Sequence, residues 1–154
     1  MVATIPPEIP DWFWDLLDSS RPSLQELVFR LEALPRDQLI EYASTYVRAA
    51  EELCDYWAGP VVNGIEFSED DTEDLCRWIV SQGPGLYAQA LALQGNLEPL
   101  VSRYWASERG EDPEYAMWST DVQNPAYRGY QSPAGIPHPI FEARFGSALQ
   151  NELE

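Results

Sequence analysis

The chain has 154 residues, a length that fits one domain, and its hydrophobic content of 45% can supply a core. Its nine basic residues, all of them arginine, stand against 26 acidic ones, so the formal net charge is -17. This balance disfavours nucleic-acid binding through a basic footprint, and no apolar run approaches the roughly 20 residues of a membrane span.

Hydrophobic residues at helical spacing predict two helices in the first part of the chain. Asp11 can cap a short helix, and Ser23 with Glu26 forms a capping box at the start of a second one. The clearest periodic pattern then runs from Asp37 to Trp57, over about five turns. Residues 61–64 predict a turn; a hairpin through Asn63-Gly64 is the alternative, but we favour a buried loop or an extended link.

Further helices are predicted for residues 68–83, 84–93, 96–107 and 113–120. From Asn124 to Pro139 the chain is rich in proline, glycine and tyrosine, which indicates a loop that packs along the helices. Phe141, Phe145 and Leu149 predict a last helical turn or two. We therefore expect an all-α, compact multi-helix single domain: an N-terminal tail at 1–10, a helical domain at 11–123 and a loop-rich C-terminal segment at 124–154.

The densest acidic cluster runs from Glu66 to Asp74. On a helix, Asp70 and Asp74 share one face, so they could bind a divalent metal ion through oxygen ligands. The same residues suit a helix start, because Ser68 and Asp71 form a capping box and acidic side chains favour the positive end of the helix dipole. We favour the capping interpretation and expect no resident metal or cofactor.

Other candidate chemistry is sparse. His138 is the only histidine, so a site with two histidine ligands is excluded, and we interpret it as a surface or packing residue of the proline-rich loop. Cys54 and Cys76 lie among apolar residues, which predicts buried, unreactive thiols. Because there is no signal peptide and there are few cysteines, we expect a cytoplasmic location.

Two segments together resemble a known bacterial family. Residues 12–21 (WFWDLLDSSR) and 56–64 (YWAGPVVNG) lead into Ser68-Glu69-Asp70, and residues 74–83 (DLCRWIVSQG) precede 87–91 (YAQAL). This arrangement, over about residues 11–101, is similar to the family called domain of unknown function 4240. The chain departs from the family at residues 65–67 and 71–72, and at Cys76, where the family has arginine. The resemblance implies a helical fold and a bacterial setting, and it supplies no catalytic residue.

With no nucleophile elbow, Walker loop or dinucleotide fingerprint, we expect a non-enzymatic protein. Its acidic surface would bind a basic protein surface, as in an immunity or antitoxin-like inhibitor or an accessory protein. A small enzyme or divalent-metal-binding domain that uses the carboxylates of 66–74 is the alternative, and mimicry of DNA by spaced carboxylates is a third. The candidate partner-binding residues are Trp14, Glu69, Asp70, Asp74, Arg77 and Trp78.

Overall fold

The computed structural model describes residues 9–53 and 59–153 and confirms the all-α fold class. Its contacts divide the chain into two compact units. The first unit comprises residues 1–10 and 48–117, and the second comprises residues 11–47 and 118–154. These bounds differ from the three predicted segments, because the C-terminal segment belongs with the first helices and not with the middle of the chain.

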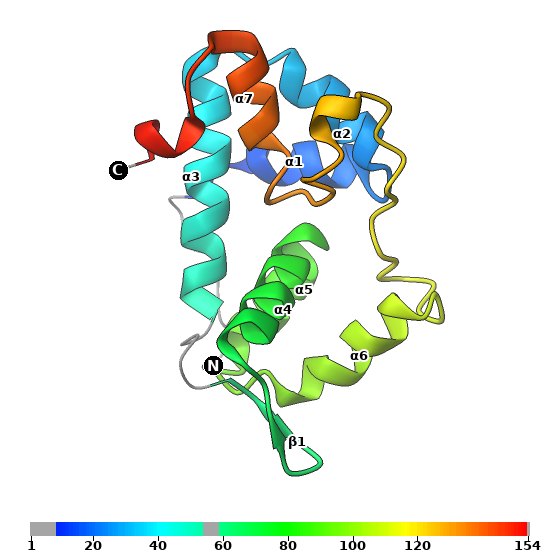
Figure 1. The fold of residues 1–154 in the computed structure, drawn as a ribbon. Coiled ribbons are helices and arrows are strands. Elements are labelled where there is room, and N and C mark those ends of the chain that lie inside the picture. Colours follow the sequence, from blue (N-terminus) through cyan, green and yellow to red (C-terminus); the bar gives the residue numbers. More distant parts are fainter. Residues whose placement is uncertain (1–8, 54–58, 154) are drawn as a thin grey trace. The chain divides into compact units, whose positions relative to one another are not determined.

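The helices and strands follow one another along the chain as shown in Figure 1. In order, they are α1 (Asp11–Ser20), α2 (Leu24–Glu32), α3 (Arg36–Leu53), β1 (Val61–Val62), β2 (Ile65–Glu66), α4 (Glu69–Ser81), α5 (Pro84–Ala92), α6 (Glu98–Glu108), the 3-10 helix η1 (Pro125–Tyr127), α7 (Pro137–Phe145) and the 3-10 helix η2 (Leu149–Glu152). The end of the long helix predicted for residues 37–57 lies outside the described residues.

The second unit joins the first helices to the end of the chain. α1 and α7 both pack against α2. The buried hydroxyl of Tyr42 donates a hydrogen bond to the carbonyl of Pro133 over 2.9 Å. At the start of α2, the Ser23 hydroxyl accepts from the Glu26 N–H, as the capping box predicts, and donates to Asp121. Residues 118–153 therefore complete the core and the cap that the first helices need.

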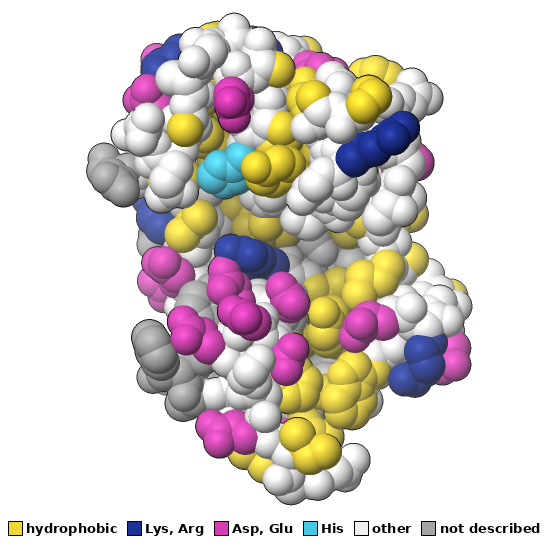
Figure 2. All heavy atoms as spheres, in the orientation of Figure 1, with side chains coloured by type: hydrophobic (Ala, Val, Ile, Leu, Met, Phe, Trp, Pro, Cys, Tyr) yellow, Lys and Arg dark blue, Asp and Glu magenta, His cyan; other side chains and the backbone are white. Residues whose placement is uncertain are grey.

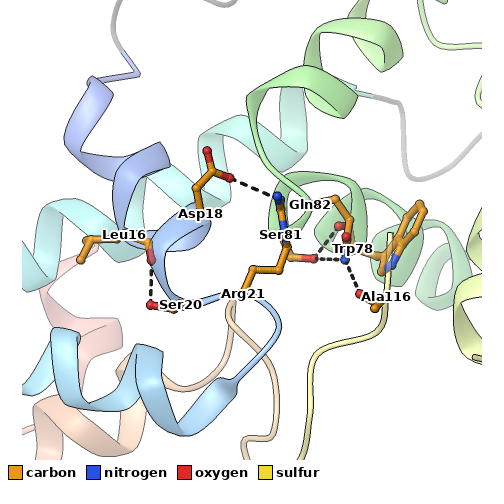
Figure 3. A network of polar contacts seen from close by, with 8 residues as sticks. All are labelled: Leu16, Asp18, Ser20, Arg21, Trp78, Ser81, Gln82 and Ala116. Carbon is orange, nitrogen blue, oxygen red and sulfur yellow. Dashed lines mark hydrogen bonds and ion pairs between the residues drawn. The ribbon is translucent and has the colours of Figure 1, made fainter. Parts of the chain in front are cut away.

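The first unit packs α4 against both α5 and α6. The hydroxyl of Tyr87 on α5 donates a hydrogen bond to the carbonyl of Ala49, over 2.9 Å. At the end of α4, the amide nitrogen of buried Gln82 donates to the carbonyl of Ala116 over 3.0 Å, and Ser81 donates to the carbonyl of Trp78 (Figure 3). These bonds satisfy polar groups that burial would otherwise penalise.

The link at residues 61–64 is a β-hairpin, so the expected buried loop or extended link is wrong. Val61 pairs with Glu66 and Val62 with Ile65 in an antiparallel register. Asn63 and Gly64 both have positive φ angles, 55° and 78°. These are the conformations of a type I′ turn, which Asn-Gly favours and which matches the twist of the two strands.

Two further expectations are wrong. Residues 113–120 form no helix: the Asp112 carboxylate accepts hydrogen bonds from the backbone N–H groups of Glu114 and Tyr115, as at a helix start, but only a bend follows. His138 lies in the first turn of α7 and not in a loop. Pro137 is at the start of that helix, where its fixed φ angle is favourable and its missing N–H costs nothing.

Cys76 is completely buried on α4 and is disulfide-bonded, so the expected thiol is wrong at this position. A helical pattern indicates that a cysteine is buried, but it does not show whether its sulfur forms a disulfide. Cys54 lies outside the described residues. Within ranges 9–53 and 59–153, no helix combines the length and apolar character needed to cross a membrane.

Candidate interaction face

The carboxylates of α4 are held in place by the cap at its start. The hydroxyl of Ser68 accepts a hydrogen bond from the Asp71 N–H over 3.0 Å, and the hydroxyl of Thr72 donates to the Ser68 carbonyl over 2.8 Å. Glu69, Asp70 and Asp71 fill the first turn, where the helix dipole favours negative charge. The predicted capping is therefore present.

Exposed carboxylates gather around this helix start. Side chains of Asp and Glu crowd the surface over α4 (Figure 2). We call the exposed part of this cluster the acidic face and define it by Glu66, Glu69, Asp70, Asp71 and Asp74. Its residues belong to one strand end and to the first two turns of one helix, so they share a rigid support.

Arg77 does not extend the acidic face as an independent cation. Its guanidinium forms an ion pair with the carboxylate of Glu73, one turn earlier on α4. Both side chains are partly exposed, and such i,i+4 pairs contribute only about 0.3–0.5 kcal/mol. The pair mainly neutralises Glu73, which leaves the remaining carboxylates to set the local charge.

The negative charge continues toward α6. Desolvation by burial and the nearby carboxylates of Glu108, Asp74 and Asp71 raise the pKa of Tyr104 to about 12. Desolvation also raises the pKa of Asp74, opposed by Arg77 and supported by its acidic neighbours. Burial is the larger cause of both pKa shifts, and the neighbouring carboxylates add to it.

Apolar surface adjoins the acidic face. Hydrophobic side chains gather over the hairpin and α6 (Figure 2). Val61 is 50% exposed and shares one face of the hairpin with its pair Glu66, whereas Ile65, 71% exposed, lies on the other face with Val62. Phe67 lies against Trp105 with ring centroids 6.1 Å apart. Such apolar side chains beside charged ones are typical of a surface that binds another protein. These apolar residues were not predictable as surface without the hairpin, whose signal in the sequence is Asn63-Gly64.

The two tryptophans predicted to bind a partner lie in the interior. Trp78 and Trp14 are each only 5% exposed. The Trp78 ring contacts Tyr104 and Tyr115, and Trp14 contacts Phe13 edge to face. We therefore leave both out of the interaction face, because neither indole is accessible to a partner in this structure.

The carboxylates do not converge as metal ligands do. Across residues 9–53 and 59–153, no group of three or more His, Cys, Asp or Glu side chains could hold a metal ion. A divalent cation needs several oxygen ligands around one point, and the acidic face spreads its carboxylates along a surface. The half-buried His138 belongs to the second unit, on α7.

Comparisons with models of known families, with curated proteins and with solved structures find no match. The resemblance over residues 11–101 therefore stays an expectation.

Proposed function

We propose that the protein is a non-enzymatic interaction protein whose acidic face binds a basic surface of another protein. The observation that carries this proposal is the exposed set of carboxylates at the start of α4, together with the exposed side chain of Val61, which pairs with Glu66 in the hairpin. The negative charge attracts the basic partner, and the apolar side chain is buried from water when the two proteins bind.

The net charge of -17 strengthens this interpretation. A strongly negative molecule attracts basic surfaces over roughly a Debye length, about 8 Å at physiological ionic strength, and raises the association rate. An immunity or antitoxin-like inhibitor, or an accessory subunit, would use this attraction to capture a basic toxin or enzyme.

The test compares two variants with equal charge changes. One carries Glu66→Gln, Glu69→Gln and Asp70→Asn in the acidic face. The control carries Glu41→Gln, Glu51→Gln and Glu52→Gln, which are exposed on α3. A partner isolated by affinity capture should bind the wild type more weakly as salt rises, and should bind the first variant more weakly than the control. An equal loss of affinity in the two variants, or an affinity that does not change with salt concentration, would contradict the proposal.

The cellular location bears on the identity of the partner. The small number of cysteines favours the cytoplasm over secretion as a disulfide-rich scaffold, as expected above. The disulfide at Cys76 favours an oxidising compartment, because disulfides are rare in the cytosol of most organisms. Immunoblotting of cell fractions for the native protein decides between these locations and limits the partners to be tested.

A further inference from the structure

The second unit has a pocket that the acidic face does not explain. Its volume is about 230 Å³, and it lies among α1, the end of α2 and the start of α3. Trp12, Asp15, Leu16 and Ser19 line it from α1 at spacings of one and two turns, so they form one face of that helix.

The size of the pocket limits what it can hold. Sites for cofactors and drug-sized molecules span about 300–1,000 Å³, and this pocket is smaller and open to solvent. It fits one long side chain of a protein better than a whole cofactor. Leu16 and Leu34 offer apolar surface for the stem of such a side chain.

The charges in the pocket favour a cationic head group. The pocket contains one acid, Asp15, and one base, Arg30. Arg30 already forms an ion pair with Glu26, at 3.3 Å between Nη2 and Oε1. Within the described ranges, the Asp15 carboxylate has no ion pair or hydrogen bond, and the Trp12 ring has no aromatic or cationic contact. One carboxylate and one indole are therefore available to a ligand.

We propose that this pocket binds an arginine side chain of the basic partner. A guanidinium is planar, so it can stack on the Trp12 ring and also donate two hydrogen bonds to the Asp15 carboxylate. This inference rests on the proposed function, since it names the residue type that such a partner inserts. It adds a second contact, on a unit other than the one that carries the acidic face.

The experiment uses small probes, so it does not need the partner. The indole N–H resonance of Trp12, assigned by its loss in Trp12→Phe, is followed by NMR while Nα-acetyl-arginine amide is added to the full chain. We expect a saturable shift. Nα-acetyl-norleucine amide tests apolar filling alone, and Nα-acetyl-glutamate amide tests an anion bound by Arg30; both should bind more weakly.

The matched variants are Asp15→Asn and Asp11→Asn, one turn apart on α1. Asp15→Asn should weaken binding of the arginine probe about threefold or more, the factor that an exposed charge pair of about 0.7 kcal/mol supplies. Asp11→Asn should leave binding unchanged, because Asp11 does not line the pocket. A cooperative thermal unfolding transition in each variant is the control that both are folded.

Three results would overturn the inference: no saturable shift with the arginine probe, equal or tighter binding of either other probe, or equal binding by the two variants. None of these three results bears on whether the acidic face binds a partner. Conversely, partner binding that ignores salt and the α4 substitutions would defeat the proposed function even if the arginine probe bound the pocket.

Discussion

The indole N–H of Trp78 donates a hydrogen bond to the hydroxyl of Ser107 over 3.2 Å, and this bond joins α4 to α6 within the first unit. Ser107 is only 1% exposed, so no water replaces it when it is removed. This hydrogen bond therefore holds the buried side of α4, the helix that carries the acidic face, against α6. It is a polar contact within an otherwise aromatic cluster.

Ser107→Ala should destabilise the protein, because it leaves the buried indole N–H without an acceptor. The expected loss is about 1–3 kcal/mol in the free energy of unfolding, measured by urea denaturation. Ser102→Ala is the control, since Ser102 is exposed on the same helix and should change stability by less than about 0.5 kcal/mol. Equal effects of the two substitutions would show that the bond contributes nothing.

Asp121 should stabilise the second unit in a pH-dependent way. Hydrogen bonds from Ser119, Gln25 and Ser23 lower the pKa of its carboxyl below the ordinary value of 3.8, despite some desolvation. The stabilisation is then fully present above pH 3.8 and is lost as the pH falls through the lower pKa of the folded state. The difference in unfolding free energy between wild type and Asp121→Asn should shrink at acid pH, and a constant difference from pH 6 to pH 2 would contradict this account.

The contribution of Asp74 to stability should depend on pH in the opposite direction to that of Asp121. Desolvation raises the pKa of its carboxyl, so ionisation costs more in the folded state than in the unfolded state. The protonated form contributes stability below pH 3.8, and this stability is lost as the pH rises through the folded pKa. Asp74→Asn should therefore be more stable than wild type at pH 7 and should lose that advantage in acid. A less stable variant at pH 7 would contradict the prediction, and Asp70→Asn, one turn earlier on α4, is the control.

The disulfide at Cys76 should be detectable and stabilising. The two cysteines of the chain should give no reaction with a thiol reagent after denaturation without reductant, and both should react after reduction. Reduction should lower the free energy of unfolding by about 2–4 kcal/mol. Cys76→Ser should match the reduced wild type and should not respond to reductant. Free thiols in the unreduced protein would disprove the bond.

The helices were predictable wherever local chemistry and hydrophobic spacing agree. Ser68 and Ser23 cap helices in the structure as they do in the pattern, because a cap depends on residues only three positions apart. The start of the acidic face was predictable for the same reason.

The features that depend on contacts far along the chain were not predictable. The composition gives the number of tryptophans but not which of them are buried. The burial of Trp78 depends on its contacts with Ser107 and Tyr115. The pocket at Trp12 also depends on α2 and α3, which pack beside α1 only in the folded unit. Between residues 113 and 120, the Asp112 carboxylate forms the hydrogen bonds of a helix cap, yet no helix follows it.

The division of the chain into two units affects how it folds during synthesis. Residues 48–117 leave the ribosome before residues 118–154, whereas α2 receives its contacts with Ser119 and Asp121 only after those later residues emerge. Closing a loop of such length costs entropy before any contact forms, so the second unit should acquire its native structure last. Until residues 118–154 emerge, α1 and α2 expose the apolar surface that this segment later covers, and nascent chains stalled near residue 118 should be the ones most readily bound by chaperones.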